Sequence, residues 1–153
     1  MNARLRAAAT ALLLLGLLAV GLLVQPAPVE ARGQLQTYMT GLDWPVALAF
    51  SPDGRVFYAE RNTGSVRIID GGTLLPTPFY TLANTATAGE RGLLGLALDP
   101  GFPASPWVYA YQTYNDVANG TVYNRIVRIL ANGNVGVSAS VILRTSCCMA
   151  RMA

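Results

Sequence analysis

The chain has 153 residues, of which 52% are hydrophobic and 12% charged, and its eleven arginines and eight acidic residues give a net charge of +3. The arginines are scattered and form no basic run, which argues against a nucleic-acid-binding surface. Lysine and histidine are both missing, and without histidine the chain lacks the usual general base and the commonest metal ligand.

The first 31 residues have the pattern of an export signal. Arg4 and Arg6 precede an uncharged apolar run over residues 7–24, and the segment after it holds two prolines and reaches a small residue at Ala31. This order predicts a hydrophobic signal helix that is cleaved after Ala31, and therefore a periplasmic or extracellular protein. The apolar run is just long enough to span a membrane, so an uncleaved anchor over residues 7–24 is the alternative.

From residue 32 onward, helical periodicity is absent and short apolar segments alternate with turns. Residues 35–41 alternate weakly and could form a short strand. Pro-Asp-Gly, Asn-Thr-Gly and Gly-Gly sequences then mark successive turns. Between these turns we expect strands over residues 46–50, 55–60 and 65–70, with an outer fourth strand over residues 78–82.

A second pass through the same pattern begins 48 residues later. Residues 94–98 repeat residues 46–50, with large side chains on one face and small ones on the other. Strands are expected to follow over residues 107–112, 125–130 and 137–143, with a polar loop at 114–123. The repeat predicts an all-β fold containing about two four-stranded blades of a β-propeller. A small β-sandwich is the alternative.

Propeller geometry would bring several loops to one end of the sheets. First strands descend beside the central channel, so the loops that enter them share a face with the loops between second and third strands. This places the loop at 89–92 beside Asp43-Trp44, residues 62–64 and the loop at 114–123, with the Pro52 and Pro100 turns opposite. Glu90 is then the charged residue nearest the axis, between glycines that allow close approach of a ligand.

Three segments resemble the soluble quinoprotein sugar dehydrogenases, the glucose/sorbosone dehydrogenase group. They are WPVALAFSPDGR at 44–55, ERNTGSVR at 60–67 and ERGLLGLALDPGF at 90–102, in the order and spacing of that family. The similarity covers about residues 38–143. It implies an exported six-bladed propeller that binds pyrroloquinoline quinone (PQQ) and calcium at its top centre. Such enzymes take a hydride from C1 of an aldose sugar.

Two departures from the family limit what the resemblance implies. Glu90 lies at the position where the sugar dehydrogenases carry a glutamine near the substrate and quinone. Residues 144–153 have no strand pattern and resemble nothing in the family, whose catalytic histidine lies in a segment just beyond the second blade. We therefore expect three parts: a signal peptide or anchor at 1–31, two blades at 32–143, and a non-matching tail at 144–153 from a frameshift or premature stop.

The candidate site residues are Glu90 and Arg91, which the resemblance places near the substrate and cofactor. The alternative for Glu90 is a solvated carboxylate paired with Arg91 or Arg61. Asp43 is expected to be a turn residue rather than the second carboxylate of a glycosidase pair. No catalytic or metal-binding residue is assigned.

Other polar groups are poor candidates for a metal site. The loop oxygens of Asn115, Asp116 and Asn119 include only one carboxylate, which is little for calcium. Cys147 and Cys148 are adjacent and have no further thiol or imidazole to complete a metal site.

Taken alone, the chain is expected to be an inactive fragment that binds neither PQQ nor calcium. Abstraction of a hydride from a sugar needs a base that takes the hydroxyl proton, and no residue here is a convincing one. Two alternative functions are a non-enzymatic exported propeller that binds carbohydrate or protein, and a propeller hydrolase such as a lactonase.

Overall fold

The computed structural model describes residue 33 and residues 35–145, and the chain divides into two compact units, Met1–Gln36 and Thr37–Ala153. The predicted signal helix and its cleavage position lie outside the described residues, as do Cys147 and Cys148. No helix in the described part of the chain is long and apolar enough to cross a membrane. The described part of the second unit consists of strands and turns.

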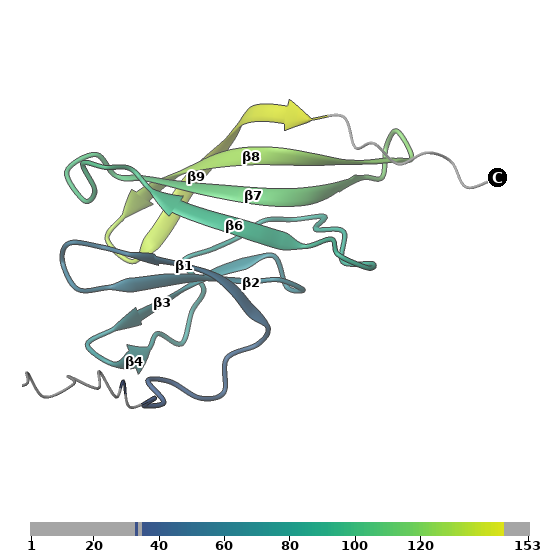
Figure 1. Ribbon diagram of the computed structural model, residues 1–153. Helices are drawn as coiled ribbons and strands as arrows, with labels where there is room; N and C mark the ends of the chain where they lie inside the picture. The colour runs from purple at the N-terminus through teal and green to yellow at the C-terminus, as the bar shows by residue number, and fades with distance from the viewer. Residues whose placement is uncertain (1–32, 34, 146–153) are drawn as a thin grey trace, which may run out of the picture. The chain divides into compact units, whose positions relative to one another are not determined.

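The second unit contains two antiparallel sheets, one stacked on the other (Figure 1). In the first sheet the order is β1-β2-β3-β4, and β5 also pairs with β3; in the second it is β6-β7-β8-β9. The strands are β1 (Pro45–Phe50), β2 (Val56–Glu60), β3 (Ser65–Asp70), β4 (Thr73–Leu74), β5 (Tyr80–Thr81), β6 (Leu93–Leu98), β7 (Trp107–Asp116), β8 (Thr121–Asn132) and β9 (Val135–Thr145).

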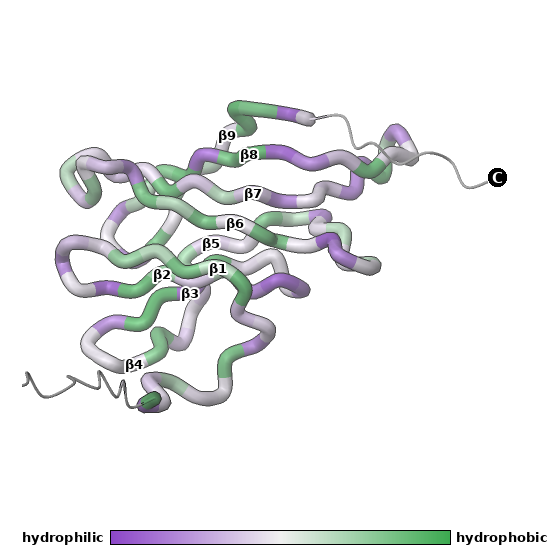
Figure 2. The backbone as a smooth tube through the Cα atoms, viewed as in Figure 1, coloured by the Kyte–Doolittle hydropathy of each residue, from purple (hydrophilic) through white to green (hydrophobic). Residues whose placement is uncertain are grey.

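The predicted equivalence of the two first strands is confirmed. β1 and β6 are each the first strand of their sheet, each pairs with the next strand in antiparallel register, and each has an irregularity near its start. They pack against one another across the junction between the sheets. Both are apolar along most of their length (Figure 2).

The core fills the space between the sheets. Phe57 lies at its centre and makes edge-to-face contacts with two other rings. Its ring centroid is 5.4 Å from that of Phe79 and 5.5 Å from that of Phe102. Because alternate residues of a strand point to opposite faces, every second residue of β2, β3, β7 and β8 enters this layer. Its fully buried members include Phe57, Ala59, Val66, Ile68, Leu93, Val108 and Ile129.

The outer edge of the first sheet differs from the expected single fourth strand. The strand expected over residues 78–82 is present as the short β5, which pairs with the start of β3, and a further short strand, β4, pairs with the end of β3. Pro76 and Pro78 lie between them. Proline has no N–H to donate, so a continuous ladder cannot pass through this segment.

The polar loop expected at 114–123 is mostly strand. β7 continues to Asp116 and β8 begins at Thr121, so only residues 117–120 form the turn. Tyr114 and Tyr123 face each other across the pair with ring centroids 5.4 Å apart. Such cross-strand aromatic pairs stabilise a hairpin that composition alone suggests is a loop.

Both ends of the predicted blade region also differ from expectation. Residues 35–41 form no strand; Met39 instead packs with Leu42 against Val56, Tyr58 and Ile69 on the outer face of the first sheet. β9 continues past Leu143, with Arg144 opposite Arg125 and Thr145 opposite Asn124. The first two residues of the segment expected to lack a strand pattern therefore belong to the sheet.

Arg55 joins the sheets at the end where β1 turns into β2. Its guanidinium donates to both carboxylate oxygens of Asp53, at 2.6–3.1 Å, and reaches the second sheet at Gly133 O (2.8 Å) and Asn134 Oδ1 (2.7 Å). These hydrogen bonds from Arg55 hold the pKa of the Asp53 carboxyl well below its usual range. The sheets are therefore fixed at this end by directional contacts as well as by the apolar layer.

Candidate functional site

The loop that enters β6 lies at the opposite end, which also holds the start of β1 and the β7–β8 turn (Figure 1). This is the arrangement that the propeller geometry predicted. Glu90 is exposed and Arg91 is half-buried. Gly89 and Gly92 both have positive φ, 62° and 150°, which glycine adopts without strain. The loop can therefore turn sharply at both ends while Glu90 faces the solvent.

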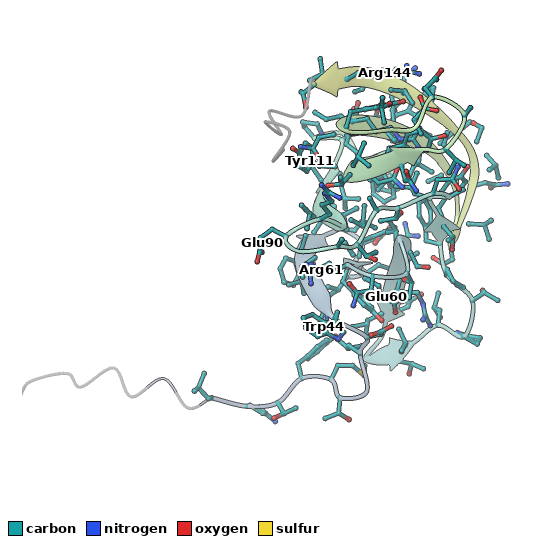
Figure 3. The ribbon with its side chains drawn as sticks, turned by 90° about the vertical axis from the view of Figure 1, so that its right-hand side faces the viewer. Trp44, Glu60, Arg61, Glu90, Tyr111 and Arg144 are labelled. Carbon is teal, nitrogen blue, oxygen red and sulfur yellow. The ribbon has the colours of Figure 1, made fainter. Side chains whose placement is uncertain are left out.

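Arg61 of the first sheet holds this loop on both sides. Its guanidinium donates a hydrogen bond to the carbonyl of Gly89, and its own carbonyl accepts one from the N–H of Leu93 at 3.0 Å. The guanidinium also lies 5.6 Å from the centre of the Trp44 ring, a cation–π contact. In Figure 3, Arg61 lies between Trp44 and Glu90, and Glu90 points away from the sheets.

Gly92 is required at this point because Arg61 lies so close. A Cβ on Gly92 would be 2.5 Å from Cγ of Arg61 and 2.7 Å from its backbone oxygen. The Gly92 carbonyl accepts a hydrogen bond from Thr113 N at 2.8 Å, which joins the loop to β7. Both sheets therefore determine where Glu90 lies.

A shallow hollow of about 490 Å³ lies beside Glu90 and Arg91. Thr113 and Asn124 line it from β7 and β8, and Thr113 Oγ1 donates to Asn124 Oδ1 at 2.8 Å. These two residues were not among the candidates predicted from the sequence. They flank the loop that was expected at 114–123 and are direct partners across the β7–β8 pair, which a single sequence does not show. The complete lining is Ala88, Gly89, Glu90, Arg91, Leu94, Thr113 and Asn124.

Gln112 anchors the other end of the segment that leads to Glu90. Its side chain is fully buried, and Nε2 donates to the carbonyl of Ala83 at 3.0 Å and to Thr85 Oγ1 at 2.6 Å. Its oxygen accepts a hydrogen bond from Arg125 Nε at 2.9 Å. A buried amide with all of these partners fixes the chain path before the loop.

Other carboxylates of the described residues do not gather at this hollow. Asp116 accepts a hydrogen bond from Asn119 Nδ2 at 2.9 Å within its own turn. Glu60 is buried and accepts from Tyr58, Thr63 and Arg67 on the outer side of the first sheet. In residues 33 and 35–145, no three His, Cys, Asp or Glu residues form a group that could hold a metal ion.

The fold and the position of the candidate site indicate the class of protein. Stacked antiparallel sheets with equivalent first strands, and a charged loop where strand-entry loops gather, make this a β-propeller-like protein with a candidate site at the loop end of its sheets. The chain belongs to the glucose/sorbosone dehydrogenase family, because the model of that family, described as Glucose / Sorbosone dehydrogenase, matches residues 42–150.

Individual relatives support this assignment. The chain is 32% identical over 81 residues to quinoprotein glucose dehydrogenase B of Acinetobacter calcoaceticus, covering 51% of this chain and 17% of that protein. A structure of a putative oxidoreductase (glucose dehydrogenase) from Thermus thermophilus is 42% identical, with a TM-score of 0.63, over 72% of this chain and 32% of that one.

The PQQ-bound aldose sugar dehydrogenase of Streptomyces coelicolor is also similar in structure. It is 31% identical with a TM-score of 0.62, over 72% of this chain and 33% of that one. The chain thus spans a third or less of the length of these three relatives.

Proposed function

We propose that residues 37–145 form two blades of a six-bladed, PQQ-dependent aldose dehydrogenase, and that the loop carrying Glu90 and Arg91 faces the sugar and the quinone. The observation that carries this proposal is the position of the loop. It is the charged entry to β6, it lies at the end where the strand-entry loops gather, and it falls inside the family match. The likeness to the PQQ-bound Streptomyces protein supports the choice of cofactor.

The described residues would supply only one side of such a site. Calcium prefers six to eight oxygen ligands, usually including several carboxylates, whereas the hollow beside β6 has the single carboxylate of Glu90. Two blades do not fit calcium or the quinone by themselves, so further blades would have to hold both. Residues 37–145 would then form only the rim of the site.

The chemistry of the rim suits a polar, partly anionic ligand. The Arg91 guanidinium can form charge-assisted hydrogen bonds with a carboxylate, the acidic group that PQQ carries. The Glu90 carboxylate can accept hydrogen bonds from sugar hydroxyls. Asn124 has its oxygen engaged by Thr113, which leaves its amide nitrogen to donate toward the hollow.

We also propose that the 153-residue chain does not oxidise sugars alone and binds neither PQQ nor calcium tightly. Removal of the sugar hydroxyl proton needs a positioned base, and the chain has no histidine and one carboxylate at the hollow. The N-terminal sequence supports export to the periplasm or extracellular space, by cleavage after Ala31 or with residues 7–24 as an anchor.

A chimeric enzyme tests the proposal directly. Residues 37–145 would replace the equivalent third of the Streptomyces coelicolor aldose sugar dehydrogenase, and aldose-dependent dye reduction would be measured with added PQQ and calcium. We expect activity from the chimera and none from the 153-residue chain. In the chimera, Glu90→Ala should raise KM about tenfold or more, because a hydrogen bond to a charged group contributes about 1.5–3 kcal/mol.

Asp70→Ala is the matched control, since Asp70 is an exposed carboxylate at the opposite end of the first sheet. It should leave KM unchanged. A folded chimera that binds no PQQ and reduces no dye would refute the proposed function. An active chimera with the same KM after Glu90→Ala would refute only the role of the loop.

A further inference from the structure

Two arginines face each other on the outer strands of the second sheet. Arg125 of β8 and Arg144 of β9 are direct partners in the antiparallel pair, so their side chains leave the same face of the sheet, with Cβ atoms about 4.5–5.5 Å apart. Like charges placed in this way destabilise a strand pair. The ion pairs among residues 33 and 35–145 all lie within residues 53–67, so no carboxylate of the described chain is paired with either arginine.

This face of the second sheet looks toward the first sheet. Val127 and Ile129 follow Arg125 at alternate positions of β8 and are buried in the core between the sheets, and alternate residues of a strand share a face. The sheet that this face meets is therefore already present, and a further blade would stack on the other side. In Figure 3, Arg144 lies at the far edge of the second sheet, apart from Glu90. The arginine pair is thus separate from the proposed sugar site.

Two tyrosine rings hold the guanidinium groups in place. The Arg125 guanidinium lies 3.7 Å from the centre of the Tyr114 ring, and the Arg144 guanidinium lies 5.2 Å from the centre of the Tyr123 ring. The two rings also contact each other across the hairpin. A guanidinium that stacks through its flat face keeps its N–H groups directed sideways, in a fork that matches two oxygens of one anion.

A buried amide anchors Arg125 from below. Its Nε donates to Gln112 Oε1 at 2.9 Å, and Gln112 is itself fully buried with its nitrogen engaged. No described residue accepts a hydrogen bond from the two Nη atoms of Arg125. The guanidinium is therefore fixed at one nitrogen, while its other donors are left for a ligand.

Space for a ligand lies beside Arg144. This arginine, Tyr123, Thr121 and the β7–β8 turn line a hollow of about 370 Å³. Asp116 is the carboxylate in that lining, and it already accepts a hydrogen bond from Asn119 Nδ2 at 2.9 Å within its own turn. Its hydrogen bonding therefore does not depend on either arginine.

We propose that Arg125 and Arg144 bind an oxyanion between them, whose oxygens accept hydrogen bonds from both guanidinium groups. The anion supplies the negative charge that the described strands lack at this point. Charge-assisted hydrogen bonds from arginine to phosphate or carboxylate are roughly twice as strong as neutral ones. Two kinds of ligand share this chemistry: a phosphate group, and the carboxylate of an acidic sugar.

Calorimetric titration of the 153-residue chain at low ionic strength tests the site, with sodium phosphate in one arm and sodium glucuronate in the other. Low salt is needed because exposed charges are screened beyond about 10 Å at 0.1 M. We expect one anion to bind per chain. Arg144→Gln and, separately, Arg125→Gln should each weaken its binding about tenfold or more. Arg128→Gln is the matched control, since it removes the same charge from β8 but Arg128 stacks on Trp107 at the opposite face.

The two arms distinguish the ligands. Tighter binding of phosphate would assign a phosphate group, tighter binding of glucuronate an acidic sugar, and equal affinities a general oxyanion site. The proposal is overturned if the unchanged chain binds neither anion, if Arg144→Gln binds as tightly as the unchanged chain, or if Arg128→Gln weakens binding as much. Arg144 is exposed, so its substitution should leave the fold intact, which circular dichroism checks. The test involves no quinone and no oxidation, so its failure would not affect the proposed dehydrogenase function.

Discussion

Replacement of Gly92 by alanine should displace the loop that carries Glu90. The new Cβ would lie 2.5 Å from Cγ of Arg61 and 2.7 Å from its backbone oxygen, closer than real Cβ contacts. That oxygen cannot retreat freely, because it accepts the hydrogen bond from Leu93 N at 3.0 Å. Overpacking costs about 1–3 kcal/mol, and a φ of 150° adds backbone strain of about 1–3 kcal/mol for a residue other than glycine.

Gly89→Ala in the same loop is the matched control. Gly89 also has a positive φ, 62°, but an added Cβ would have nothing within 4 Å. Its substitution should cost about 1–2 kcal/mol, from left-handed backbone strain alone. Denaturant unfolding at one fixed protein concentration would compare the two, with about 2–6 kcal/mol expected for Gly92→Ala. Equal costs for the two variants would show that the contact with Arg61 does not constrain the loop.

Three further predictions concern the two sheets. Burial, helped by a neighbouring carboxylate, raises the pKa of Tyr58 to about 12. Folding therefore favours the neutral phenol. The unfolding free energy should fall by about 2–3 kcal/mol between pH 10 and 12, where the unfolded state ionises and the folded state does not. Tyr58→Phe should remove that fall in a pH series of denaturant titrations. Ile129→Ala in the core should cost about 2–5 kcal/mol, against less than about 1 kcal/mol for Ile142→Ala, which is 49% exposed on β9; similar melting temperatures for both would contradict the core assignment. Gln112→Leu should cost about 2–3 kcal/mol, because it leaves buried hydrogen-bond partners unpaired. It should also speed hydrogen exchange at the amide of Ala86, which donates to the carbonyl of Thr113 at 2.9 Å; unchanged exchange at this amide would show that the segment is held without Gln112.

The sequence predicted the sheets well where turn chemistry and side-chain alternation agreed. The strands before and after Pro-Asp-Gly at 52–54 were found within one residue of their observed ends. The outer part of the β7–β8 hairpin was missed, because residues 114–123 include Asn115, Asp116, Asn119 and Gly120 and look like a loop. What extends the hairpin is pairing between strands, including the Tyr114–Tyr123 contact, and a single sequence does not show which residues face each other.

The position of the candidate loop could be predicted from the sequence, but its neighbours could not. Glu90 and Arg91 could be identified because they are charged residues at the entry to an apolar strand. Thr113 and Asn124 belong to a different hairpin, and only the register of that hairpin brings them to the loop. The part played by Arg61 was also out of reach, since it depends on the closeness of Gly92 across the sheet junction.

Two arginines fix the junction between the sheets, one at each end. Arg55 connects the β1–β2 turn with Gly133 and Asn134 of the second sheet, while Arg61 connects the start of the first sheet's second turn with Gly89. An apolar layer resists separation of the sheets but does little against sliding, because dispersion and burial are nearly non-directional. A guanidinium with several fixed donors can set the register that the layer leaves free. The position of Glu90 on the second sheet is thus set by residues of the first, so the loop can be placed correctly only when the two sheets have joined.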